Sequence, residues 1–264
     1  MEWTSTKGLL VIIGGNEDKI KKKLVLQYVA DNSHATCIGI IPTASTYGKE
    51  LGDEYAAIFT KMGIPKTHVI AARYVGDADT PEYHAMVDEC DAFFFTGGDQ
   101  VKLVEVFQKS ALMQKIYAKH SAGALIAGTS AGAAAVSDTM LFDGDDAGFK
   151  KGSVRTMPGF GLLPNITVDT HFTQRNRLPR LAQILASGAN LYAIGVDENT
   201  ALSIDAAGNA FVVGGEIVTF VAATNIFTSN YSNVPQGGLY SVHGLSTSFL
   251  AAGERFDLPT WTRR

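Results

Sequence analysis

The sequence has too little cysteine for a disulfide framework and too little net charge for a general nucleic-acid surface. Its 264 residues include two cysteines, Cys37 and Cys90, and each lies in or beside an apolar stretch. We interpret both as reduced residues of the core. The net charge is −4 at pH 7, so a nucleic-acid partner is not expected.

Long apolar runs and nucleotide-binding loops are absent as well. The first apolar run, residues 8–13, is too short to span a membrane, and neither a basic segment nor a cleavage site accompanies it. The sequence contains no Gly-x-Gly-x-x-Gly pattern and no Gly-Lys-Ser/Thr loop. We therefore expect a cytoplasmic protein with no membrane partner, no cofactor and no metal.

What the sequence has is the composition and patterning of a globular α/β protein. Hydrophobic residues make up 46% of the chain and charged residues 18%, which allows a large core. Short apolar runs alternate with helical stretches across short loops. This alternation predicts a mostly parallel central sheet with helices on both faces and a small β-rich C-terminal part. No linker, internal repeat or low-complexity segment is present, so we expect a single domain over residues 1–264.

The expected elements follow from hydrophobic runs and from the glycines and prolines that interrupt them. Strands are expected at residues 8–13, 36–41, 68–72, 91–95, 165–172, 191–196 and 200–204, and helices at 19–30, 50–61, 81–90 and 175–186. The glycine-rich segment 141–161 is expected to be a long loop. Residues 210–213 and 216–222 are expected to pair as an antiparallel ribbon.

The chain is organised around a Gly-x-Ser-x-Gly turn at residues 128–132. An apolar run that predicts a buried strand precedes Ser130, and alanines that favour a helix follow it. A strand that turns sharply into a helix exposes the residue at its corner, and flanking small residues allow that bend. In this context the pattern predicts a nucleophile elbow at Ser130, whereas a plain tight turn is the alternative.

Three further turns follow expected strands, at residues 14–16, 42–45 and 96–100. Ligands of parallel α/β sheets bind at the carboxyl ends of the strands. The elbow at Ser130 is a fourth turn of this kind. The convergence of these turns predicts a binding cleft at that edge.

A serine nucleophile needs a base, and the base needs an orienting acid. Of the six histidines, His171 ends an expected strand at the edge where the turns gather, so it is the best candidate. Asp169 and Glu198 both qualify as the acid, because Asp169 shares a strand face with His171 and Glu198 follows its own strand. Spacing alone does not choose between them. The order Ser130, His171, Glu198 would differ from the usual α/β-hydrolase order.

Two groups of residues suit the rest of an acyl-transfer site. The amides of Ala131 and of the Gly97-Gly98 turn are candidate donors to an oxyanion. Arg175, Arg177 and Arg180 follow His171 closely. Their cations would oppose the dipole of a helix that begins there, so we favour capture of substrate carboxylates over a solvated helix face.

Taken together, four motifs resemble the cyanophycinases, serine peptidases related to aspartyl dipeptidase E. The motifs are Gly97-Gly98-Asp99-Gln100, Gly128-Thr129-Ser130-Ala131-Gly132-Ala133, Asp169-Thr170-His171-Phe172 with the three arginines and Leu181, and Gly195-Val196-Asp197-Glu198-Asn199-Thr200-Ala201. The resemblance runs over nearly the whole chain. It implies a flavodoxin-like or class I glutamine-amidotransferase-like fold, a homodimer and a triad of Ser130, His171 and Glu198.

The same resemblance implies a substrate and its pocket. The pocket residues would be Gln100, Asp169, Thr170, Arg175, Arg177 and Arg180. The substrate would be cyanophycin, a poly-aspartate with arginine on each β-carboxyl, cut from its C-terminal end to β-Asp-Arg dipeptides. The family usually has glutamine where this chain has Thr170, so other β-aspartyl peptides stay open. The alternatives are an α-aspartyl dipeptidase and, in another class, a non-catalytic protein that binds acidic peptides.

Overall fold

The computed structural model describes residues 8–144, 148–224 and 228–263. A sheet of nine strands lies at its centre in the order β17-β16-β11-β10-β1-β5-β4-β2-β3. One half of this sheet is parallel and consists of β1 (Leu10–Ile13), β2 (Cys37–Ile41), β3 (Lys66–Val69), β4 (Ala92–Phe95) and β5 (Leu125–Thr129). The other half is antiparallel and consists of β10 (Thr200–Ile204), β11 (Asn209–Gly214), β16 (Arg255–Asp257) and β17 (Thr262–Arg263).

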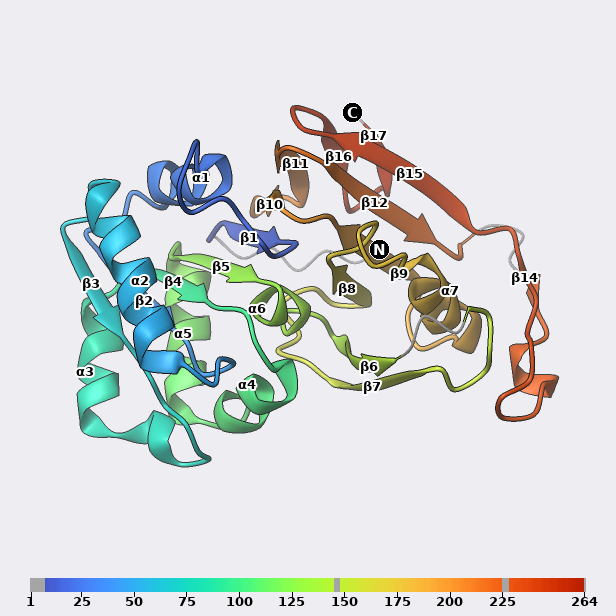
Figure 1. The fold of residues 1–264 in the computed structure, drawn as a ribbon, viewed down its shortest axis with the longest axis horizontal. Helices are drawn as coiled ribbons and strands as arrows, with labels where there is room; N and C mark the ends of the chain where they lie inside the picture. Colours follow the sequence, from blue (N-terminus) through green and yellow to red (C-terminus); the bar gives the residue numbers. More distant parts are fainter. Residues whose placement is uncertain (1–7, 145–147, 225–227, 264) are drawn as a thin grey trace.

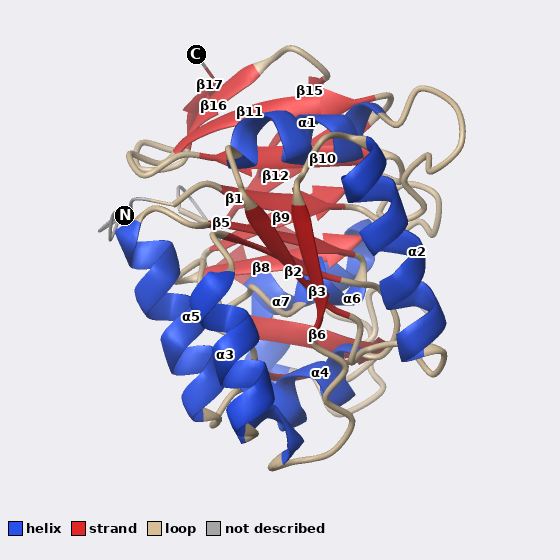
Figure 2. Ribbon diagram, turned by 90° about the vertical axis from the view of Figure 1, so that its left-hand side faces the viewer, coloured by secondary structure: helices blue, strands red, loops and turns tan. Residues whose placement is uncertain are grey.

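Helices cover both faces of the parallel half (Figures 1 and 2). One face carries α1 (Leu24–Ser33) and α2 (Gly48–Lys61), and the other carries α3 (Pro81–Glu89), α4 (Gln100–Phe107), α5 (Ala111–Ala122) and the short α6 (Ala131–Ala134). Side chains alternate between the two faces along a strand. In β1, Val11 and Ile13 pack toward α1 and α2, and Leu10 and Ile12 pack toward the opposite layer. The predicted α/β fold around a large sheet with a parallel core is therefore confirmed.

A second sheet of four strands lies beside the first, in the order β15-β12-β9-β8. Its members are β8 (Ile166–Thr170), β9 (Tyr192–Val196), β12 (Ile217–Ala222) and β15 (Ser246–Ala251). Strands β8 and β9 are parallel, and α7 (Leu178–Ser187) packs on them (Figure 1). The remaining short elements are the strand pairs β6 (Thr139–Gly144) with β7 (Val154–Pro158) and β13 (Thr228–Ser229) with β14 (Val242–His243), and the 3₁₀ turns Asp77–Asp79 and Tyr231–Asn233.

The prediction of a long loop at residues 141–161 is wrong. The segment contains most of the β6–β7 hairpin, in which Thr139 pairs with Pro158 and Gly144 with Val154. Residues 145–147 of this loop lie outside the described residues. Met140 and Leu141 of β6 are buried. The glycines therefore do not keep this segment out of regular structure.

The predicted ribbon between residues 210–213 and 216–222 is also wrong. Strand β11 pairs with β10 and β16 in the large sheet, whereas β12 pairs with β9 and β15 in the second sheet. Gly214, with φ of +121°, is the last residue of β11, directly before the chain passes from one sheet to the other.

Two helices begin later than predicted. Helix α1 begins at Leu24, five residues after the expected start, because the Asp18 carboxylate accepts hydrogen bonds from the amides of Ile20, Lys21 and Lys23 and holds the preceding segment in a turn. Helix α7 begins at Leu178, so Arg175 precedes it. None of the helices in the described ranges is long and apolar enough to cross a membrane.

Candidate active site

Ser130 occupies a strained corner between β5 and α6. Its backbone has φ of 49° and ψ of −106°, a conformation that non-glycine residues rarely adopt outside functional sites. The neighbouring glycines allow the bend because a Cβ on Gly132 would lie 2.3 Å from the Phe95 carbonyl oxygen, and one on Gly128 would lie 2.5 Å from Gly132. The strand-to-helix corner predicted from the sequence is present, and it is closely packed.

His171 follows β8 directly and faces this corner. Its Nε2 lies 2.9 Å from Ser130 Oγ. The His171 amide donates a hydrogen bond of 2.8 Å to the carbonyl oxygen of Gly14, and the backbone φ at His171 is +48°. The turn after β1 therefore fixes where the imidazole lies.

Glu198 lies on the other side of the imidazole, in the turn between β9 and β10. Its Oε1 is 2.7 Å from His171 Nδ1, and its Oε2 accepts a hydrogen bond of 2.7 Å from Asn16 Nδ2. The Glu198 amide donates to Gln174 Oε1 at 3.1 Å. A hydroxyl, an imidazole and a carboxylate thus lie in one hydrogen-bonded row. Of the two acids that the sequence leaves open, Glu198 and not Asp169 contacts the imidazole.

The electrostatic environment favours a neutral imidazole beside an ionised carboxylate. Burial lowers the pKa of His171 below its ordinary value, and the nearby Arg175 cation lowers it further, against the opposing effect of Glu198. The hydrogen bond from Asn16 is the main cause of a lowered pKa at Glu198. Near neutral pH, His171 is therefore ready to accept a proton.

Asp169 belongs to a separate buried cluster with two of the three arginines. Its side chain is 3% exposed, its Oδ1 lies 3.0 Å from Arg177 Nη1, and its Oδ2 lies 3.1 Å from Arg180 Nε. Burial raises the pKa of Asp169, and the two guanidinium groups oppose that rise. The neighbouring Thr170 is buried too, and its amide donates to Asp169 Oδ1. Arg175 is exposed.

The glycine turn after β4 packs against the nucleophile corner. A Cβ on Gly97 would lie 3.4 Å from Ser130 Cβ, and one on Gly98, whose φ is +140°, would lie 2.1 Å from the Ala44 carbonyl oxygen. The amide of Ala131 is the first of α6. The Gln100 side chain contacts β6, because its Nε2 donates to the carbonyl oxygen of Leu141 at 3.0 Å.

The cleft at Ser130 also contains residues that the sequence analysis missed. A cavity of about 530 Å³ is lined by Ser130 and His171 together with residues 16–20, parts of α2, Gly97 and Thr129. Glu17 is 5% exposed and accepts hydrogen bonds from Thr129 Oγ1 at 2.6 Å and from the Tyr55 hydroxyl. Its position directly after the glycine turn at residues 14–16 is the signal that could have identified it.

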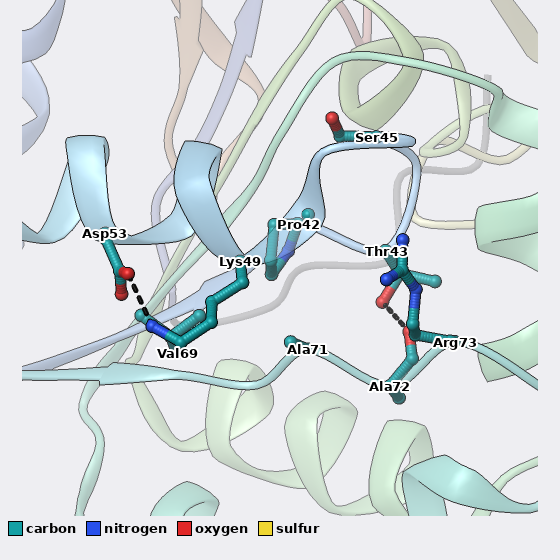
Figure 3. Close-up of a pocket in the computed structure, with 10 residues that line it drawn as sticks. Pro42, Thr43, Ser45, Lys49, Asp53, Val69, Ala71, Ala72 and Arg73 are labelled. Atoms are coloured by element: carbon teal, nitrogen blue, oxygen red, sulfur yellow. Dashed lines mark hydrogen bonds and ion pairs between the residues drawn. The ribbon is translucent and has the colours of Figure 1, made fainter.

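A second cavity, of about 260 Å³, lies between α2 and the end of β3 (Figure 3). The charged side chains at its rim are already bound within the chain. Lys49 Nζ lies 2.6 Å from Asp53 Oδ2, and Arg73 donates to the Thr46 carbonyl oxygen at 2.8 Å. This cavity contains none of the predicted site residues. Within the described ranges, no group of three or more His, Cys, Asp or Glu side chains is placed to hold a metal ion.

Comparison with solved structures supports the fold. The crystal structure of a peptidase from an acI-B1 Actinobacterium superposes with a TM-score of 0.71 at 22% identity, covering 97% of this chain and 99% of that chain. A putative peptidase E protein from Listeria monocytogenes EGD-e superposes with a TM-score of 0.52 at 17% identity, covering 78% of this chain and 97% of that chain.

Comparison with sequences identifies the family. A cyanophycinase of Trichormus variabilis is 33% identical over 258 residues, which cover 96% of this chain and 87% of that protein. A cyanophycinase of Synechococcus elongatus is 30% identical over the same length, with 96% and 80% covered. The model of peptidase family S51 matches residues 9–211. Because this match extends over most of the length of the chain, the chain belongs to peptidase family S51.

Proposed function

We propose that this chain is a serine exopeptidase that hydrolyses cyanophycin from its C-terminal end and releases β-Asp-Arg dipeptides. The observation that carries the proposal is the hydrogen-bonded row of Ser130, His171 and Glu198 in a member of family S51. The cyanophycinases that are 30–33% identical to it support the choice of substrate.

The geometry suits a two-step acyl transfer. His171 Nε2 takes the proton of Ser130 Oγ as the oxygen attacks an aspartyl carbonyl carbon, and Glu198 stabilises the resulting imidazolium. The amides of Ala131 and Gly98 are the proposed donors to the oxyanion. His171 then protonates the leaving amine, and the acyl-enzyme forms. Water, deprotonated by His171, releases the acyl group and restores Ser130.

The arginines are assigned two different tasks in this proposal. Arg175 is exposed, and its amide donates to the carbonyl oxygen of His171 at 3.0 Å, so its guanidinium is suited to a substrate carboxylate near the base. Arg177 and Arg180 are held by Asp169. We assign Asp169 the task of orienting these two guanidinium groups, in place of the direct contact with substrate that the resemblance implies.

The test is incubation of the enzyme with purified cyanophycin and mass analysis of the released products. The parent chain should release β-Asp-Arg, and Ser130→Ala should release none while its circular dichroism spectrum and Tm stay unchanged. Dipeptide release by Ser130→Ala at the parent rate would refute the assignment. A protein that only binds acidic peptides would show no labelling of Ser130 by a serine-directed electrophile.

An α-aspartyl or other β-aspartyl dipeptidase is the second candidate. It is favoured by Thr170, where a shorter side chain stands in place of the glutamine usual in cyanophycinases, and by the likeness of the fold to a putative peptidase E. A panel of Asp-X and β-Asp-X dipeptides beside the polymer separates the two activities. A dipeptidase would cleave the short peptides and leave the polymer intact.

A further inference from the structure

Glu17 is a buried carboxylate that the proposed mechanism does not use. It follows the turn after β1, is 5% exposed and lines the same cavity as Ser130 and His171. Thr129, which donates to its Oε2 at 2.6 Å, immediately precedes the nucleophile. The carboxylate therefore lies in the wall of the cleft. Its hydrogen bond from Thr129 links it to the residue next to Ser130 in the sequence.

Both hydrogen-bond donors to Glu17 are uncharged. One is the Thr129 hydroxyl, and the other is the Tyr55 hydroxyl. Burial and the charge of Glu17 raise the pKa of Tyr55, so that phenol stays protonated and neutral. The two donors orient the carboxylate without cancelling its charge. Each carboxylate oxygen has a further lone pair for another donor.

Within the described residues, no cation forms an ion pair with Glu17. Lys19 lies in the same cavity wall, but its Nζ is 3.0 Å from Glu54 Oε2 and 4.2 Å from the centroid of the Tyr55 ring. The contrast with Asp169 is clear, because that buried carboxylate has two arginines within 3.1 Å. A buried charge without a counter-charge is unfavourable, and a cation that enters the cleft would supply that counter-charge.

We propose that Glu17 binds a cationic side chain of the substrate, a guanidinium in the first place, on a residue close to the scissile bond. This inference rests on the proposed function and deepens it, since it assigns the cationic group of the substrate a partner in the wall of the cleft. The guanidinium fork matches the two oxygens of a carboxylate. Glu54 lines the same cavity, but its carboxylate already forms an ion pair with Lys19.

The test measures binding and does not need turnover. In a Ser130→Ala background, calorimetry compares a peptide of two β-Asp-Arg units with the same peptide carrying citrulline, in which a neutral urea replaces the guanidinium. With Glu17 present, the arginine peptide should bind about 30-fold or more tightly than the citrulline peptide. With Glu17→Gln added, the two peptides should bind within about threefold of each other. An arginine preference that survives Glu17→Gln overturns the inference.

Two controls separate substrate recognition from a structural role. Glu54→Gln changes a half-exposed carboxylate of the same cavity that already has Lys19 as its partner, so the preference for arginine should persist. The Tm of Glu17→Gln should not fall, because a neutral amide replaces a charge that has no counter-ion. If Glu17→Gln causes a large fall in Tm and weakens the binding of both peptides equally, Glu17 has a structural role, and the inference is overturned. Absence of hydrolysis by the Ser130-containing chain would contradict the proposed function alone.

Discussion

The imidazole of His171 fills the space that a side chain on Gly15 would need. A Cβ built on Gly15 would lie 2.4 Å from His171 Cε1 and 2.5 Å from Nε2. The same turn holds the His171 backbone through the Gly14 carbonyl oxygen, and its Asn16 holds Glu198. This turn thus positions the proposed base and its orienting acid, although Gly15 precedes His171 by 156 residues in the sequence.

Gly15→Ala should therefore abolish most of the activity. The methyl group must displace the imidazole, and a shift of about 1 Å in a reacting group costs on the order of 100-fold in rate. The measurement is kcat/KM on β-Asp-Arg polymer together with Tm. Gly63→Ala is the matched control, since Gly63 has a similar φ of +97° but nothing within 4 Å of its Cβ position. Both variants should lose about 1–2 kcal/mol of stability from the positive φ, and only Gly15→Ala should lose activity. Equal activity in the two would contradict the contact.

Glu198→Gln should lower kcat while the fold and substrate affinity stay close to those of the parent chain. The amide removes the charge that stabilises the imidazolium, and in known triads the corresponding change costs about 10⁴-fold. Because the hydrogen bond to Glu198 also raises the pKa of His171, the residual activity should have its acid limb at lower pH. Asn16→Ala, which removes only the donor to Oε2, should cost far less. A Glu198→Gln enzyme with parental kcat would exclude Glu198 as the orienting acid.

The pH dependence of kcat/KM should reflect the lowered pKa of His171. The imidazole must be neutral to accept the serine proton, so activity falls as pH drops through the pKa of the free enzyme's histidine. Burial and Arg175 both lower that pKa, which places the acid limb below the ordinary value of about 6.5. Arg175→Gln removes a positive charge that opposes protonation, so the limb should move to higher pH. A limb that moves to lower pH would contradict this electrostatic account.

Much of this site could be predicted from local patterns along the chain. The Gly-x-Ser-x-Gly turn marks a strand-to-helix corner, and His171 and Glu198 each follow the carboxyl end of a strand, where ligands of parallel sheets bind. The strands before His171 and Glu198 belong to the second sheet and not to the sheet of β5, and the turn after β1 links them to the nucleophile through Gly14 and Asn16. The structure accordingly brings Ser130, His171 and Glu198 into one hydrogen-bonded row.

The rest depends on pairings between distant segments, which periodicity does not reveal. The glycine-rich segment after β6 has the composition of a loop, yet Thr139 and Pro158 pair across it. Strands β11 and β12 are neighbours in sequence and belong to different sheets. The hydrogen-bond partners of Glu17 are Tyr55 on α2 and Thr129 on β5. The dipole argument for the arginines failed to anticipate that Asp169 balances Arg177 and Arg180 from within the chain.

Asp169→Asn should be strongly destabilising because it leaves two arginines beside a neutral amide. Asp169, Arg177 and Arg180 are largely buried, with side-chain exposures of 3%, 15% and 7%. Removing one partner of a buried ion pair costs about 3–5 kcal/mol, which urea denaturation measures directly. Arg175→Ala is the control for the same stretch of basic residues. Arg175 is exposed, so the loss should be within about 0.5 kcal/mol. An Asp169→Asn chain as stable as the parent would show that the cluster contributes no net stability.

The thiols of Cys37 and Cys90 should be inert in the native protein although their sulfur atoms are 3.2 Å apart. Both side chains are buried, and burial is the main cause of the raised pKa of each thiol. Only the thiolate reacts readily, so Ellman's reagent should modify neither cysteine until guanidinium unfolds the chain. Ala252→Cys adds a thiol at an exposed turn and should react at once under native conditions, which checks the reagent. Rapid native labelling of Cys37 or Cys90, confirmed by peptide mass mapping, would mean that this part of the core opens far more readily than its packing indicates.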